Sequence, residues 1–256
     1  MVTKSHTYQA IWQDSQKINW QVSDLISPNL TFDFKRPFLP ESIAQVADMP
    51  GLNRLEKLTL NHLRGYSYLH LFVLVEQFII PMVLDQVKAL GYDDIFATQS
   101  LLGFAEDESK HIHLFQSFAQ AFEQGFGTPC EFIGPTPAIV AQILSHHPLA
   151  VLLLTLQFEW TTQSHYLESM RHNHEEDLDP RFCDLLKFHW LEEAQHTKLD
   201  VLLTYALIDR MLVSQVEGAI ADYLTLLHLL HNALMQQVDL DVSNLERRLQ
   251  RSIASP

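Results

Sequence analysis

The segment Tyr68-Leu-His-Leu-Phe-Val-Leu-Val-Glu76-Gln-Phe-Ile-Ile-Pro-Met-Val-Leu84 is almost entirely apolar, yet a carboxylate stands at its centre. The segment Leu149-Ala-Val-Leu-Leu-Leu-Thr-Leu-Gln-Phe-Glu159-Trp has the same character and is interrupted by Glu159. A carboxylate on the apolar face of a core helix costs several kcal/mol unless something pairs with it. No Lys or Arg lies within a helical turn of either glutamate, so we expect their partners to come from elsewhere in the chain.

Two further motifs offer such partners, Glu108-Ser-Lys-His111 and Glu193-Ala-Gln-His196. Residues three apart share one face of a helix, so each Glu and His of a pair points the same way. Two lone glutamates and two Glu-x-x-His pairs form the ligand set of a carboxylate-bridged two-metal site in a four-helix bundle. One such pair is expected by chance in this chain, and the prediction therefore depends on the order and helical context of all six residues.

The two halves of the chain repeat this order. Glu76 lies 32 residues before Glu108, and Glu159 lies 34 residues before Glu193. Each half therefore predicts a helical hairpin that carries a lone Glu and then a Glu-x-x-His pair. Packing of the two hairpins would bring the ligands together at the centre of a bundle.

Four carboxylates balance the charge of two divalent ions, and such sites hold their ions about 3.5–4 Å apart. Oxygen donors with imidazole and without thiolate suit iron or manganese. His189 lies four residues before Glu193 and shares its helix face, so we expect an additional ligand on one metal; the alternative is a histidine that supports a ligand. The predicted metal ligands are Glu76, Glu108, His111, Glu159, His189, Glu193 and His196.

We expect other polar residues near these motifs to have roles other than metal binding. Asp107 and Glu192 each precede a ligand glutamate and are expected to face another side of their helices. Asp200, one turn beyond His196, is a candidate hydrogen-bond acceptor for that ligand. His165 is expected to be a core or surface residue without a metal.

The candidate walls of a substrate pocket are the apolar residues next to the ligands in sequence, namely Phe72, Phe104, Phe158, Trp160, Phe188 and Leu191.

Composition, net charge and cysteine content limit the classes of protein to which this chain can belong. Apolar residues make up 47% of the 256 residues and charged residues 19%, which is a globular balance. The formal net charge of −14 argues against binding to nucleic acid or to an anionic membrane surface. Two cysteines are too few for a disulfide framework, and the N-terminus has no apolar signal segment. We find no stretch of about twenty apolar residues that predicts a membrane span, and we therefore expect a cytoplasmic protein.

The periodicity predicts an all-α fold in a single domain, residues 1–256. Residues 1–51 read as an N-terminal arm with a short helix at 41–48, residues 52–210 as the four-helix bundle, and residues 211–256 as additional C-terminal helices. Gly65 and Pro81 are expected to bend the first long helix, and Pro148 to interrupt the third. The expected helices span 53–90, 93–124, 137–171, 180–210, 213–237 and 242–252.

These motifs resemble those of the ferritin-like diiron carboxylate superfamily over roughly residues 53–210. The sequences Asp107-Glu-Ser-Lys-His111 and Glu192-Glu-Ala-Gln-His196 are similar to the soluble acyl-carrier-protein desaturases. The extra His189 makes the motif most similar to diiron oxygenases of the p-aminobenzoate N-oxygenase type. The small aldehyde-deformylating oxygenases share the ligand spacing as well.

The resemblance implies a ferritin-like bundle that holds two iron ions, or an iron and a manganese ion, and activates dioxygen. It implies an oxygenase or oxidase acting on a small organic substrate such as an amine, an acyl chain or an aldehyde. No flavin or nicotinamide motif is present, so an external electron donor is expected, and a homodimer is common among such proteins. Phe115 stands where radical-forming members carry a Tyr, which argues against a radical role. The alternative is a non-catalytic helical protein that stores metal or binds an apolar ligand.

Overall fold

The computed structural model describes residues 7–27, 30–90, 93–171, 173 and 175–253, and within these ranges the chain forms helices and no strand. The predicted all-α class is therefore confirmed. The helices are α1 (Tyr8–Ser15), α2 (Val22–Leu25), α3 (Glu41–Ala44), α4 (Arg54–Leu90), α5 (Ile95–Phe126), α6 (Thr136–Leu144), α7 (Pro148–Ser164), the π-helical turn η1 (His165–Met170), α8 (Pro180–Ile208) and α9 (Val213–Leu249).

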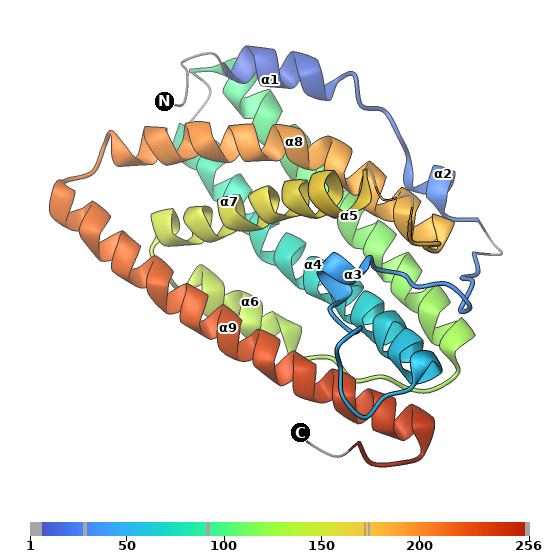
Figure 1. Ribbon diagram of the computed structural model, residues 1–256. Coiled ribbons are helices and arrows are strands. Elements are labelled where there is room, and N and C mark those ends of the chain that lie inside the picture. Colours follow the sequence, from blue (N-terminus) through green and yellow to red (C-terminus); the bar gives the residue numbers. More distant parts are fainter. Residues whose placement is uncertain (1–6, 28–29, 91–92, 172, 174, 254–256) are drawn as a thin grey trace.

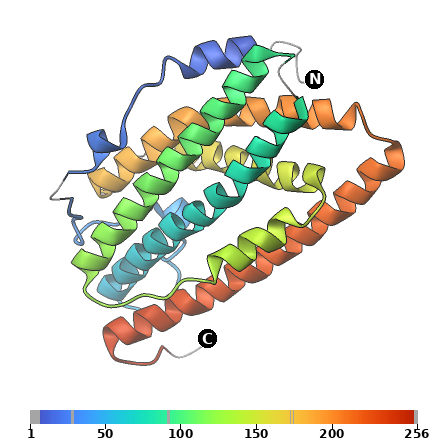
Figure 2. The ribbon, with the colours of Figure 1, turned by 180° about the vertical axis from the view of Figure 1, so that it is seen from behind.

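Four long helices form two pairs. Helix α4 makes its most extensive contacts with α5, and α7 does so with α8. Figures 1 and 2 show the α7–α8 pair lying obliquely across the α4–α5 pair, with the long α9 along one side of the molecule. In two of these helices, α5 and α8, the residue just before the helix caps its first amides. Asp94 accepts from the amides of Phe96 and Ala97, and Asp179 accepts from those of Arg181 and Phe182.

The core consists of two apolar clusters along the length of the helices. One cluster takes the first half of α4, up to Val73, and the second half of α5, from Leu114. The other takes α4 from Leu74 and the first half of α5, up to Phe104. A short layer separates the two clusters along both helices, and this layer carries the predicted metal ligands. Apolar packing on either side therefore positions a polar centre.

Helix α4 continues through both Gly65 and Pro81. A Cβ at Gly65 would lie 3.1 Å from Phe38 and 3.3 Å from Phe182, so the missing side chain allows these rings to pack against the helix. An 18-residue window of α4 is apolar enough to cross a membrane by length and composition, contrary to the sequence-based expectation. Of that window, 67% is buried inside the protein, and the core position of α4 explains its composition.

The interruption before Pro148 is confirmed, since α6 ends at Leu144 and α7 begins at Pro148. The prediction of two helices at 213–237 and 242–252 is wrong, because α9 is continuous from Val213 to Leu249. The residues that join the two predicted helices contain no Gly or Pro. Gln237 donates to Asp241 at 2.8 Å, and both face α4, where each contacts Ser67.

The N-terminal arm is more helical than expected, because α1 and α2 precede the predicted short helix. Thr7 caps α1 by accepting from the amide of Ala10, and Ile11 is buried in the second apolar cluster. Helices α1 and α2 both contact α5 and α8. The arm thus covers the line along which α5 and α8 meet, near the layer of metal ligands (Figure 1).

Candidate metal centre

All seven predicted ligands lie in the polar layer between the two apolar clusters, and all are buried. They form two groups, in each of which one nitrogen or carboxylate oxygen per residue lies within 4.8 Å of the others. The first group, here called group A, is Glu76, His111, His189 and Glu193. The second, group B, is Glu108, Glu159, Glu193 and His196. Glu193 belongs to both and joins them into one centre.

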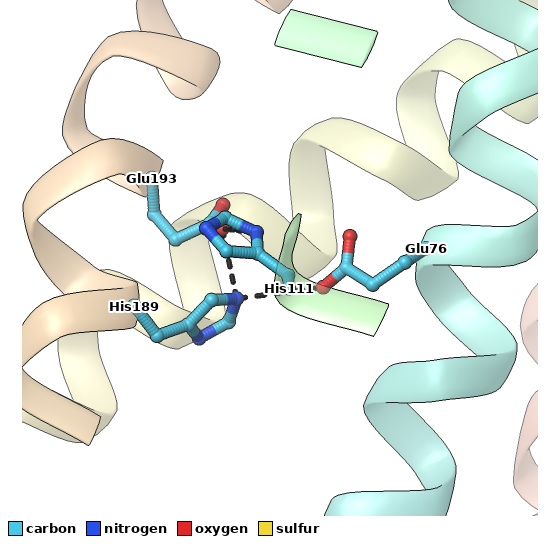
Figure 3. A group of neighbouring side chains, drawn as sticks. All are labelled: Glu76, His111, His189 and Glu193. Atoms are coloured by element: carbon cyan, nitrogen blue, oxygen red, sulfur yellow. Dashed lines mark ion pairs between the residues drawn. The ribbon is translucent and has the colours of Figure 1, made fainter. Parts of the chain in front are cut away.

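Group A brings together side chains from α4, α5 and α8, as Figure 3 shows. Glu193 and His189 extend from α8 toward Glu76, which extends from α4 (Figure 3). His189 Nε2 lies 2.8 Å from Glu193 Oε1 and 3.4 Å from Glu76 Oε1. His111 Nδ1 lies 3.2 Å from Glu193 Oε1. The donor atoms of two imidazoles and two carboxylates thus face a common point.

In group B, three carboxylates surround the imidazole ring of His196. Its Nδ1 lies 2.9 Å from Glu108 Oε1, 3.4 Å from Glu193 Oε2 and 3.8 Å from Glu159 Oε2. Group B therefore offers one imidazole and three carboxylates, whereas group A offers two of each. Two ions held here would be coordinated unequally, in line with the expectation that His189 is an additional ligand on one metal.

The hydrogen bonding of these atoms tests whether they suit metal ions. Although His189 Nε2 and His196 Nδ1 lie within 2.9 Å of carboxylate oxygens, neither forms a hydrogen bond, because the atoms do not point at one another. Buried polar atoms almost always have a hydrogen-bond partner, and oxygen and nitrogen atoms that converge without bonding one another are the kind of ligand set that a cation binds. The buried atoms without a partner include Glu76 Oε2, Glu108 Oε1 and Oε2, His111 Nδ1, Glu159 Oε2, His189 Nε2, Glu193 Oε1 and His196 Nδ1. The residues therefore fit a pair of metal ions.

The outward nitrogens of two ligand rings are held by carboxylates from the opposite helix. His111 Nε2, from α5, lies 2.9 Å from Glu192 Oε2 of α8. His196 Nε2, from α8, lies 3.4 Å from Asp107 Oδ2 of α5. Such bonds fix the ring orientation and leave Nδ1 directed at the metal. The expectation that Asp107 and Glu192 face away from the site is wrong, since each faces the neighbouring helix of the centre.

Lys110 connects these two supporting carboxylates. Its Nζ lies 3.2 Å from Asp107 Oδ1 and in close contact with Glu192 Oε1. Trp20, from the N-terminal arm, covers this contact, with Lys110 Nζ 4.3 Å from its ring centroid and the ring stacked parallel to that of His111. Sequence reasoning missed both residues. Lys110 could have been suspected because it is a basic residue directly before His111, whereas no sequence pattern relates position 20 to position 111.

Burial and neighbouring charges shift the pKa values within the centre. Burial alone lowers the pKa of His111, but the neighbouring carboxylate of Glu108 and the hydrogen bond with Glu192 raise it to about 10. Burial likewise opposes protonation of His196, and the charges of Glu193 and Glu108 raise its pKa well above 6.5. Burial and the charge of His111 hold the pKa of His189 well below 6.5. In the metal-free protein, two protonated rings thus balance part of the carboxylate charge, while His189 is neutral.

The remaining predicted residues lie outside the two groups. Asp200 is fully buried, but neither of its oxygens accepts a hydrogen bond, so it does not support His196 as expected. His165 Nδ1 lies 3.3 Å from the hydroxyl of Tyr68 and contributes to neither group. Trp160 is 67% exposed and forms no wall of the centre.

Aromatic rings do line the centre on other sides. Phe72 and Phe115 pack edge-on against His189, with centroid distances of 5.1 and 4.9 Å. Phe104 stacks on the ring of His196 at 4.0 Å. These contacts exclude water from the ligands and restrict rotation of the imidazoles.

No protein-family model matches the chain, and no curated protein matches its sequence.

Proposed function

We propose that the protein is a diiron oxidoreductase that activates dioxygen and oxidises a small organic substrate. The observation that carries this proposal is the convergence of seven buried side chains, from α4, α5, α7 and α8, on two adjacent groups that share Glu193. A dry two-ion centre of carboxylates and imidazoles is typical of ferritin-like diiron proteins. The oblique crossing of the two helix pairs is compatible with such a bundle.

The side chains would hold one ion in group A and the other in group B. Bound iron would supply the electron-transfer chemistry that dioxygen needs, which amino-acid side chains lack. The protein's own contribution is to fix the ligands and exclude water. Asp107 and Glu192 orient the rings of His196 and His111, and Phe72, Phe104 and Phe115 close the apolar wall. His189, neutral by virtue of its low pKa, can offer its nitrogen without releasing a proton.

Net oxidation of a substrate by dioxygen requires electrons from outside the centre. The sequence contains no motif for flavin or nicotinamide binding, and we propose an electron-donating protein or reductant as a partner. The substrate class is an amine, an acyl chain or an aldehyde, as the resemblance to diiron oxygenases suggests.

The test is anaerobic loading of the metal-free protein with Fe(II), followed by exposure to air and stopped-flow absorbance. The proposal predicts uptake of two iron ions per chain and a transient visible absorption band. Slow formation of ferric oxide without a band would indicate storage, and absence of stoichiometric uptake would indicate a protein without a metal function. Glu193→Ala serves as the matched control, because it removes the one ligand that both groups share.

A further inference from the structure

A second site lies between α4, α6, α7 and α9. A cavity of about 290 Å³ is lined there almost entirely by apolar side chains. They include Leu74 and Phe78 of α4, Leu154 and Phe158 of α7, and Leu226 and Leu230 of α9. None of the seven predicted metal ligands lines it. Its volume lies near the lower end of the range that small-molecule ligand pockets occupy.

A smaller cavity of about 180 Å³ adjoins the first, since Leu71, Ile133 and Leu234 line both. This second cavity is polar on one side, where Arg64 and Asp241 stand. Arg64, which lines the smaller cavity, and Phe78, which lines the larger, lie 14 residues apart on α4. At the rise of an α-helix this corresponds to about 21 Å along α4, and the charged side chains Arg64 and Asp241 line the smaller of the two adjoining cavities.

Two of the polar side chains that line the smaller cavity already accept hydrogen bonds within the protein. Asp241 Oδ1 accepts hydrogen bonds from Ser67 and Gln237, and Gln237 Oε1 accepts from the amide of Ile133. Arg64 is the only cation that lines either cavity, and it forms no hydrogen bond or ion pair with any described residue. A guanidinium with free donors is suited to a planar, bidentate anion. Asp241 is the opposing charge: its Oδ1 accepts from Ser67 and Gln237, and although burial raises its pKa, the charge of Arg64 opposes that shift.

We propose that this cavity binds a fatty carboxylate, with the alkyl chain in the apolar part and the carboxylate on Arg64. The apolar part gains free energy from the burial of each methylene group, and only the polar end can receive a charged head group. This binding site shares no residue with groups A and B.

The test is isothermal titration calorimetry of the metal-free protein with decanoate, decanol and decylamine. Decanoate should bind at one site per chain and more tightly than the other two. Equal or tighter binding of decylamine would overturn the proposal, because Asp241 would then be the partner of the head group. Absence of saturable decanoate binding would also overturn it. Neither result depends on iron, so a failure here is distinct from a failure of the proposed oxygenase activity.

Two variants locate the ligand. Arg64→Gln should weaken decanoate binding by at least about tenfold, through loss of a charge-assisted hydrogen bond, and leave decanol unaffected. Ala233→Trp, which places a large ring in the apolar cavity, should weaken both ligands. Arg54→Gln is the matched control, because Arg54 is an exposed arginine on the same helix and lines neither cavity. Unchanged decanoate affinity in Arg64→Gln, with circular dichroism showing a folded protein, would overturn the assignment of the head group.

Discussion

The outward ring nitrogen of His111 lies 2.9 Å from Glu192 Oε2, so a ligand of α5 is held in place by a carboxylate of α8. The reverse contact joins His196 of α8 to Asp107 of α5. Each helix thus supplies a Glu-x-x-His pair and also the residue that orients the histidine of the other pair. The relative placement of α5 and α8 is therefore coupled to the direction in which both imidazoles offer Nδ1.

Replacement of Glu192 should weaken the metal bound in group A. Glu192→Leu removes the acceptor for His111 Nε2–H, and loss of such a supporting contact typically costs about 10–100-fold in metal affinity. Glu192→Gln retains an oxygen acceptor and should have a smaller effect. Titration of the metal-free variants with Co(II) measures the change. Glu106→Gln, at an exposed site of α5, is the control, and equal affinity of Glu192→Leu and the control would contradict the role of Glu192.

The sequence predicted which Glu and His side chains lie together in the buried centre, but not the residues that contact them, for a physical reason. Glu76 and Glu159 are conspicuous because an unpaired carboxylate is costly in an apolar segment, and periodicity placed α4 within one residue of its observed start. Glu192 precedes Glu193 directly and by helical phase points about 100° away from it. Whether the side chain of Glu192 then contacts solvent or a neighbouring helix depends on how the helices pack, and this cannot be read from a single sequence. Trp20 was missed because its contact with Lys110 joins distant segments.

Lys110 should affect both metals, because it contacts the carboxylates that support both groups. In Lys110→Met, the neighbouring charges of Asp107 and Glu192 lose their shared counter-charge, and both binding steps should weaken by about tenfold, within the range for loss of a supporting residue. Lys110→Arg preserves the charge and should retain most of the affinity. Calorimetric titration resolves the two steps. Lys88→Met is the control, since among the described residues Lys88 pairs with the exposed Asp85 alone, and an effect of Lys110→Met on a single step would contradict the coupling.

Removal of individual glutamates should separate the two groups. Glu193→Ala should abolish both metals, Glu76→Ala the metal of group A, and Glu159→Ala the metal of group B. Native mass spectrometry after loading with Fe(II) under anaerobic conditions counts the bound ions. Two ions retained by Glu159→Ala would remove Glu159 from the centre, and one tightly bound ion in Glu193→Ala would show that Glu193 is not shared.

His189 should be a ligand rather than a support, because its Nε2 faces both carboxylates of group A. His189→Phe should lower the affinity for the group A metal and change the d–d absorption of the Co(II)-loaded protein. His165→Ala is the matched control. His165 is a half-buried histidine whose pKa is also lowered by burial, but its ring contacts the hydroxyl of Tyr68 and lies in neither group. An unchanged Co(II) spectrum in His189→Phe would assign His189 a supporting role.

Stability of the metal-free protein should depend on the protonation of His62, which lies far from the ligands along α4. Burial lowers its pKa below 6.5, against the opposing effects of its hydrogen bond to the Arg36 carbonyl and the charge of Asp179. Because the unfolded chain accepts the proton more readily, this contribution to stability is fully present above pH about 6.5 and is lost as the pH falls toward the folded-state pKa.

The variant His62→Gln does not titrate and keeps an N–H donor that can reach the Arg36 carbonyl. Its free energy of unfolding should therefore fall less than that of the wild type between about pH 7.5 and pH 5.5, measured by urea denaturation. The raised pKa values of His111 and His196 act with the opposite sign, because protonation stabilises the folded state there. Both proteins retain these two rings, so they cancel in the comparison. Parallel stability curves for the two proteins would show that the native state accepts a proton at His62 as readily as the unfolded chain does.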